Sequence, residues 1–366
     1  MFKLFSEFKY FDTALLIATA LLSIVGLALL YSTSVADGTT GVFWRQFIFL
    51  GLGLVCFFFF SFFDYHTLSK ANKVFYVIFV ILLIYLLVFG SNIRGGRRWI
   101  DLGFFRFQVA EFVKICVILG LSRLLYLRRG QINSWGNILW SFFYTVIPAV
   151  LVLVEPDLGS AIIIGSIWAG VILVSPIKKR FLIILFVSFL IVAGLSWKFA
   201  LKDFQKDRVL IFLNPKLDPR GRGYNVRQAA IAVGSGQLWG RGLGKGLQSE
   251  HKFLPERQTD FIFAASSEEV GFFGMTALLI IFFTMFFRIV QIAQNARDDL
   301  GMYIAFGVFF MLFTHVTINI SMNIGLLPVT GIPLPFISAG GSSLVVTLIL
   351  LGIVQNIARQ SKILRF

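Results

Sequence analysis

The stretch NKVFYVIFVILLIYLLVFG, residues 72–90, has no charged side chain after Lys73. An apolar run of about 17–25 residues is long enough to cross the hydrocarbon core of a bilayer as a helix. The rest of the 366-residue chain has the same character, since 57% of its residues are hydrophobic and only 14% are charged. Soluble proteins carry about 25% charged residues. The composition therefore predicts a protein that crosses the membrane many times.

Ten stretches of this kind predict an all-α fold of ten transmembrane helices within a single membrane domain, residues 1–366. They lie near 10–31, 43–63, 72–90, 108–126, 137–155, 158–175, 181–200, 265–288, 301–322 and 338–358. A long polar interval, 201–264, separates the seventh and eighth spans. It is too rich in glycine for a packed soluble domain. We expect short helices here, among them one over 226–233, that lie on the membrane and line a cleft.

Lysine and arginine in the short connections predict the orientation, because cytoplasmic loops carry an excess of both. With the N-terminus inside, the cytoplasmic connections hold Lys3, Lys9, Lys70, Lys73, Arg123, Arg128, Arg129, Lys178, Lys179, Arg180, Arg288, Arg297, Arg359, Lys362 and Arg365. The short external loops hold only Arg45, Arg94, Arg97, Arg98 and Arg106. Both termini are therefore expected in the cytoplasm and the long loop outside. The net charge of +15 fits anionic headgroups better than nucleic acid.

Cysteine and histidine give no sign of a disulfide framework or a metal site. Cys56 and Cys116 both fall inside apolar runs, where a free thiol behaves as a small hydrophobe. His66, His251 and His315 are scattered along the chain. His315 shares a helical spacing of four with Asn319 and Asn323. This spacing predicts hydrogen bonding between helices.

Carboxylates in or beside the bilayer mark candidate functional residues, because a charge there is costly. Those near the predicted spans are Glu111, Glu155, Asp157, Asp260, Glu268 and Glu269, all toward the external side. Glu111 shares one helical face with Gln108 and Lys114, since the three are spaced three apart. This face predicts either an internal ion pair that fixes helix packing or the wall of a polar pocket that opens outward.

Asp260 stands where the long loop returns to the bilayer, in the sequence LPERQTDFIF, residues 254–263. A carboxylate at the edge of a low-dielectric region is a setting in which a general base is tuned. The alternative is that Thr259 or Asp260 caps the apolar helix that follows.

The glycine-basic run 240–246 contains Arg241 and Lys245. It is not a Walker loop, because Trp239 and Gly246 stand at two positions that the motif fixes. The glycines leave backbone amides accessible beside the two cations. The run therefore predicts either a pyrophosphate site or a flexible solvated loop.

The segment before the last span contains Pro328, Pro333 and Pro335, which prevent a regular helix before about Ser338. Span ten therefore begins with exposed amides near Gly340 and Gly341. A helix N-terminus aimed into a cavity would attract an anion.

Taken together, these motifs resemble the SEDS family (shape, elongation, division and sporulation), which are bacterial cell-wall polymerases of ten spans. The resemblance covers essentially the whole chain and is carried by residues 98–100, 108–114, 155–159, 224–228, 254–263 and 333–343. The sequence TGIP, residues 330–333, is more similar to the RodA elongation branch than to the FtsW division branch.

The resemblance implies an inverting peptidoglycan glycosyltransferase in the bacterial cytoplasmic membrane. The 4-hydroxyl of one lipid II disaccharide attacks the anomeric carbon of another, and undecaprenyl pyrophosphate leaves. The implied partners are a class B penicillin-binding protein and other cell-elongation membrane proteins, with no nucleic acid. A divalent cation, Mg²⁺ or Mn²⁺, would help the leaving group, although no dedicated metal cluster is visible. The alternatives are a lipid II flippase and a non-catalytic scaffold for a penicillin-binding protein.

By position, Asp260 matches the family's essential aspartate and is the candidate catalytic base. The candidate substrate-binding residues are Arg98, Trp99, Arg106, Gln108, Glu111, Lys114, Asp157, Gln228, Arg241, Lys245, Ser338, Gly340, Gly341 and Ser342. The chain departs from the family's pattern at 109–110 (Val-Ala for the usual Pro-Ser), at Gln258 (usually histidine) and at Ala339 (usually tyrosine). Gln258 puts in doubt any mechanism in which that histidine relays a proton.

Overall fold

The computed structural model describes residues 8–36, 38, 40–90, 98–101, 103, 106–129, 133–199, 203–214, 217–218, 221–246 and 254–363. Several residues used above lie outside these ranges, namely Lys3, Arg94, Arg97, His251 and Arg365.

Each of the ten predicted spans coincides with one long helix. These helices are α2 (Thr13–Ala36), α3 (Gly41–Phe62), α4 (Tyr65–Phe89), α5 (Val109–Leu127), α6 (Trp135–Val154), α7 (Leu158–Val174), α8 (Lys179–Phe199), α12 (Ile262–Gln294), α13 (Asp299–Asn323) and α14 (Gly341–Ile363). Seven of them, α2–α4, α6 and α12–α14, are long and apolar enough to cross a membrane. Helix α7 is apolar but shorter, and α5 carries Glu111, Lys114 and Arg123.

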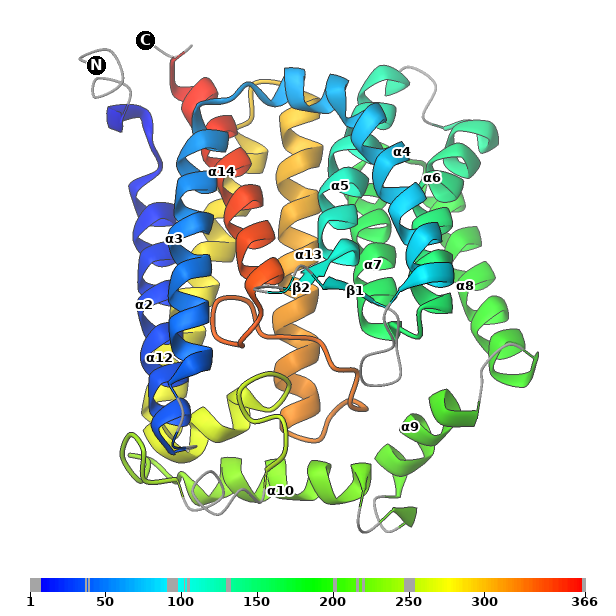
Figure 1. The fold of residues 1–366 in the computed structure, drawn as a ribbon. Helices are drawn as coiled ribbons and strands as arrows, with labels where there is room; N and C mark the ends of the chain where they lie inside the picture. The colour runs from blue at the N-terminus through cyan, green and yellow to red at the C-terminus, as the bar shows by residue number, and fades with distance from the viewer. Residues whose placement is uncertain are drawn as a thin grey trace.

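The helices form one bundle with α13 near its middle, against α12, α7 and α5 (Figure 1). Of the seven apolar helices, α14 is the most enclosed. In its most apolar stretch 83% of the residues are buried, against 17% in α3 and in α4. It packs closely on α3 because Gly352 lets the backbones approach. A Cβ at Gly352 would stand 2.5 Å from the Phe57 carbonyl oxygen.

The described ends of the chain meet at one end of the bundle, where Lys362 Nζ donates to the Phe11 carbonyl at 2.9 Å. The helices α9 (Asp203–Leu213) and α10 (Arg222–Ser235) lie across the opposite end (Figure 1). Helix α10 extends beyond the predicted 226–233 at both ends, since it continues through Gly223 and Gly234 and its caps are Gly221 and Gly236. A small hairpin pairs β1 (Trp99–Asp101) with β2 (Arg106–Gln108) antiparallel, Trp99 opposite Gln108.

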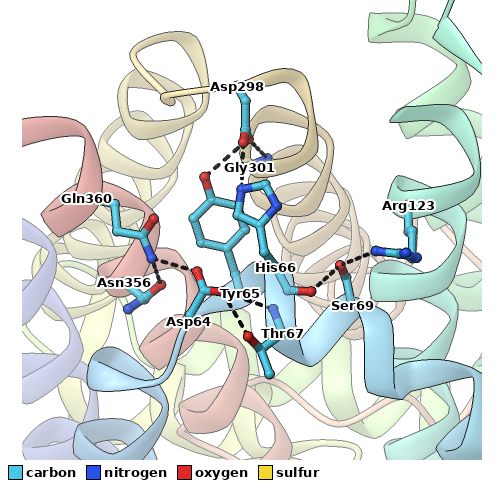
Figure 2. Close-up of polar contacts among 10 residues, drawn as sticks. All are labelled: Asp64, Tyr65, His66, Thr67, Ser69, Arg123, Asp298, Gly301, Asn356 and Gln360. Carbon is cyan, nitrogen blue, oxygen red and sulfur yellow. Dashed lines mark hydrogen bonds and ion pairs between the residues drawn. The ribbon is translucent and has the colours of Figure 1, made fainter. Parts of the chain in front are cut away.

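A polar cluster ties three helices together at the end of the bundle that carries the described chain ends (Figure 2). Asp298, which precedes α13, accepts a hydrogen bond from the Tyr65 hydroxyl at 3.1 Å and lies 2.7 Å from His66 Nε2. Asp64 caps α4 and accepts a hydrogen bond from Gln360 of α14 at 3.0 Å. The cluster, defined by Asp64, Tyr65, His66, Asp298 and Gln360, therefore joins α4, α13 and α14.

Helix α12 is broken at Gly271, whose φ of 66° and ψ of −170° are not helical. In a continuous helix, the N–H groups of Phe272 and Phe273 would donate to the carbonyls of Glu268 and Glu269. The break removes both bonds and leaves two donors and two acceptors inside the helix.

The segment 237–242 of the long loop supplies the missing partners, and we call it the clamp segment. The carbonyls of Gln237 and Leu238 accept from the two freed N–H groups at 2.9 and 3.1 Å. The N–H groups of Arg241 and Gly242 donate to the two freed carbonyls at 3.0 and 2.9 Å. All four backbone groups at the break are therefore satisfied, as a buried backbone requires.

Candidate active site

A cavity of about 760 Å³ lies where segments far apart in the sequence meet. Its walls come from α3, the hairpin, α5, the α6–α7 turn, residues 254–260, α13 and residues 331–343. Figure 1 shows the hairpin and the segment before α14 between the middle of the bundle and the end crossed by α9 and α10. The candidate residues that line it are Arg98, Trp99, Arg106, Gln108, Glu111, Lys114, Asp157, Asp260, Gly340, Gly341 and Ser342.

Asp260 lines this cavity and is half-buried. The N-cap of α12 is Phe261, whose side chain makes no capping hydrogen bond. The backbone of Asp260, the residue before it, is fixed because its carbonyl accepts from Asn319 at 3.1 Å and Asn323 at 3.0 Å. A Cβ at Gly331 would stand 3.4 Å from Asp260 Oδ2, so glycine leaves room beside the carboxylate.

The two asparagines of α13 also bind neighbouring backbone. Asn319 donates to the Ile332 carbonyl at 2.7 Å. Asn323 Oδ1 accepts from the Ala264 N–H at 3.1 Å, in the first turn of α12. Of the hydrogen bonds predicted between helices, the one from Ala264 to Asn323 joins α12 to α13. The bonds of Asn319 reach non-helical residues instead, Asp260 and Ile332.

Glu111 and Lys114 form an ion pair of 2.5 Å, with 2% and 0% of their side chains exposed. Both also line the cavity, so this helical face carries an internal ion pair and forms part of a cavity wall as well. Lys114 Nζ lies 3.2 Å from His315 Nε2 as well. Glu111 Oε2 is buried and has no hydrogen-bond partner within the described residues.

The α6–α7 turn holds Arg98 against the wall. Arg98 donates to the carbonyls of Glu155, at 3.1 Å, and Pro156, and its Nη1 lies 3.9 Å from Asp157 Oδ2. Asp157 caps α7 by accepting from the Ser160 N–H at 3.0 Å. The Glu155 carboxyl is 1% exposed and has no partner in the described part of the chain. Burial raises its pKa to about 8; the Asp157 charge adds to the rise and Arg98 opposes it.

The start of α14 is anchored to α3 and to the hairpin. Gln46 Oε1 accepts from the Gly340 N–H at 3.2 Å. The Ser342 hydroxyl accepts from the Gln108 N–H and donates to the Arg106 carbonyl, both at 3.3 Å. As predicted, the helix begins only after the proline segment, at Gly341, and its first residues line the cavity.

Four candidate residues are not among those that line the cavity: Gln228, Arg241, Lys245 and Ser338. Ser338 is buried and donates to the Thr259 carbonyl at 2.7 Å, so it links two segments of the cavity wall without lining the cavity itself. Gln228 lies on α10.

Arg241 and Lys245 lie near the α12 break, contrary to the predicted pocket of glycines and cations. Arg241 Nε is 3.7 Å from Glu268 Oε1, and Lys245 is exposed. The physical reason is that the N–H groups of Arg241 and Gly242 already donate to two carbonyls that the break at Gly271 leaves without helical partners. The run is therefore neither a free loop nor part of the cavity wall.

Arg45 is a cavity cation that the sequence marks only as a charge of a short external loop. It lines the cavity from the second turn of α3, next to Gln46. The signal in the sequence is an arginine just inside the start of an apolar span, where a charge is costly. Among the described residues, no group of three or more His, Cys, Asp or Glu side chains could hold a metal ion.

The family model for FtsW, RodA and SpoVE, described as cell cycle protein, matches residues 12–363. The chain belongs to this family. Stage V sporulation protein E of Bacillus subtilis (strain 168) is 36% identical over 364 residues, with 96% of this chain and 98% of that protein covered. Peptidoglycan glycosyltransferase MrdB of Escherichia coli (strain K12) is 38% identical over 293 residues, with 79% and 78% covered.

Solved structures of this family share the fold. A chain of a peptidoglycan synthase complex that coordinates polymerization and crosslinking matches with a TM-score of 0.81 at 30% identity, covering 96% of this chain and 98% of that one. The rod shape determining protein RodA of Thermus thermophilus matches with a TM-score of 0.72 at 27% identity, covering 96% and 97%. The protein therefore has a RodA-like fold of membrane helices.

Proposed function

We propose that the protein is a peptidoglycan glycosyltransferase of cell elongation that joins lipid II disaccharides into glycan strands. Family relatives such as MrdB of Escherichia coli and RodA of Treponema pallidum carry the name peptidoglycan glycosyltransferase. The observation that carries the proposal for this chain is the Asp260 carboxylate in a cavity also lined by Arg45, Arg106 and the first residues of α14.

At the anomeric carbon one C–O bond forms and one breaks, and one proton moves from the acceptor hydroxyl to the base. The acceptor 4-hydroxyl gives its proton to the Asp260 carboxylate as its oxygen bonds to the donor's anomeric carbon. The bond from that carbon to the pyrophosphate oxygen breaks, and undecaprenyl pyrophosphate leaves. Direct displacement inverts the anomeric centre. Hydrogen bonds from Asn319 and Asn323 to the Asp260 carbonyl orient the base.

The pyrophosphate is best accommodated beside α14. The helix N-terminus presents N–H groups and the positive end of its dipole. Arg45 and Arg106 line the same cavity, and Arg106 is 58% exposed although it lies 3.7 Å from Asp101. Arg98 and Lys114 are engaged with the wall and act as fixed charges rather than as mobile ligands.

We place the protein in the bacterial cytoplasmic membrane as one ten-span domain, with both termini inside and the long loop outside. The excess of lysine and arginine at one end and the meeting of the described chain ends support this orientation. The solved relative that acts in a complex for polymerization and crosslinking supports a class B penicillin-binding protein as partner.

A lipid II flippase, the main alternative, would need polar groups reached from both sides in turn. The polar cluster of Figure 2 instead ties α4, α13 and α14 at the end of the bundle that carries the described chain ends. A scaffold without chemistry leaves the cavity position of Asp260 unexplained.

The test is glycan-chain formation from purified lipid II, by the protein alone and with a class B penicillin-binding protein. Asp260→Asn keeps the shape of the side chain and removes the base, so we expect polymerisation to fall by roughly 10²–10⁴-fold. Asp207→Asn, on α9 and outside the cavity lining, is the matched control. Near-parental polymerisation by the Asp260 variant would refute this role for the carboxylate.

A further inference from the structure

We propose that His315 is a positioning residue, which holds the Lys114 ammonium on Glu111 Oε1 and so leaves Glu111 Oε2 for a donor group of the substrate. The catalytic consequence rests on the proposed function. The geometric part, a direct coupling of His315 to Lys114, stands independently of it.

The surroundings of His315 fix one form of its ring. Its side chain is buried, 1% exposed, and lines the cavity from α13. Nδ1 lies 3.3 Å from the Pro333 carbonyl, which can only accept, so Nδ1 carries the hydrogen. Nε2 lies 3.2 Å from Lys114 Nζ, which can only donate, so Nε2 is the bare acceptor. A second proton would place two buried cations side by side, so the ring is neutral.

This arrangement makes the two oxygens of the Glu111 carboxylate inequivalent. Lys114 is held between Glu111 Oε1 at 2.5 Å and His315 Nε2 at 3.2 Å, which restrains the ammonium from reaching across to the second oxygen. Oε2 is buried without a described partner, in a residue that lines the cavity. A buried acceptor without a donor is costly. A hydroxyl or amide N–H of a carbohydrate supplies the missing donor.

One face of α13 contacts both Lys114 and the Asp260 backbone. His315, Asn319 and Asn323 are spaced four apart on α13, so they lie on one face. The histidine reaches Lys114 and Pro333, and the asparagines reach Ile332 and the Asp260 carbonyl. One rigid element thus places the base and the Glu111–Lys114 pair relative to each other.

Two substitutions separate the two contacts of the ring. In His315→Asn, the short amide can keep the donor to the Pro333 carbonyl but cannot reach Lys114. In His315→Gln, the longer side chain can bring an acceptor to Lys114. We expect the Asn variant to lose roughly 10–100-fold in kcat/KM, mainly in kcat, because misplacing a site group by about 1 Å is that costly. We expect the Gln variant to retain most of the activity. Thr317→Val, at an exposed position of α13, is the control.

A thermal-unfolding cycle with Lys114→Met tests the coupling without any activity assay. The melting-temperature loss caused by His315→Asn should largely vanish in the Lys114→Met background, since the contact is already gone. An equal loss in both backgrounds, or equal activities of the Asn and Gln variants, would overturn the proposal. If Asp260→Asn polymerised normally, the proposed function would fail while this cycle still decided the role of His315.

Discussion

The acidic residues around the cavity differ in what their surroundings do to the charge. Glu111 is neutralised by Lys114 at 2.5 Å, and Asp157 is occupied by the first turn of α7. Glu155 is buried with no described partner, whereas Asp260 is half-buried and lines the cavity. A general base has to remain reachable by the substrate, and of these four side chains only Asp260 is not almost fully buried.

Glu155 should make stability depend on pH. Its pKa is raised from 4.5 to about 8 by burial and by the Asp157 charge, so the folded protein holds a proton that the unfolded chain releases. The stabilising effect is complete below about pH 4.5 and is lost as the pH rises toward 8, by at most about 1.4 kcal/mol per pH unit.

In Glu155→Gln this loss cannot occur. The melting temperature of the variant relative to the parent should therefore climb between pH 5 and pH 8, when both are followed in the same detergent. A difference that stays constant over that range would mean that Glu155 is ionised in the folded protein.

Residue spacing predicted part of the site. The three-residue period placed Gln108, Glu111 and Lys114 on one wall, since a helix period is local information. It could not place Arg241 and Lys245, because their position follows from backbone bonds to a helix far along the chain. The engagement of His315 with Lys114 depends on the packing of α13 against α5, which no local pattern encodes.

At the scale of elements, the positions of the helices were predictable, although α4 begins at Tyr65 rather than 72 and α12 ends at Gln294 rather than 288. The break in α12 was not predictable. Apolar runs bounded by charges and prolines encode where a span lies. Gly271 lies inside such a run, and glycine within a helical pattern is common enough to give no signal by itself. Among the described residues, the clamp segment supplies partners for the four freed backbone groups, as a backbone at membrane depth requires.

Gly271→Ala should destabilise the protein strongly. The residue has a φ of +66°, and an added Cβ would stand 2.2 Å from the Gly240 nitrogen in the clamp segment. The backbone strain alone costs about 1–3 kcal/mol, and the clash adds to it. Gly165→Ala, on α7 with nothing within 4 Å of the added Cβ, is the matched control and should be neutral or slightly stabilising. Melting temperatures of the purified variants measure both, and equal values would contradict this account of the break.

For the whole molecule, the proposed sidedness is testable by cysteine labelling after Cys56 and Cys116 are replaced by alanine. Val42→Cys and Gly340→Cys line the cavity and should react with an impermeant thiol reagent added outside spheroplasts. Ile118→Cys, which is 0% exposed within the bundle, should stay unlabelled from either side. Asn295→Cys, exposed in the turn between α12 and α13, should label only in inverted vesicles.

Lipid II should protect Gly340→Cys, because the pyrophosphate is proposed to lie beside it. Labelling of Ile118→Cys from the cytoplasmic side that depends on lipid II would show alternating access. That outcome would favour the flippase over the polymerase.

The clamp segment limits how modular this chain can be. A designer who exchanged residues 201–264 for another loop would treat it as a separable cassette, yet that exchange removes the only described partners of the two N–H groups and two carbonyls around Gly271. Since these four contacts are made by main-chain atoms, they depend on the backbone spacing between positions 237 and 242, whereas Asp260, in the same interval, has to be kept for its side chain. Insertions or deletions between positions 237 and 242 should therefore be excluded in any recombinant of relatives, because they would shift this register and leave the backbone groups at the break unpaired.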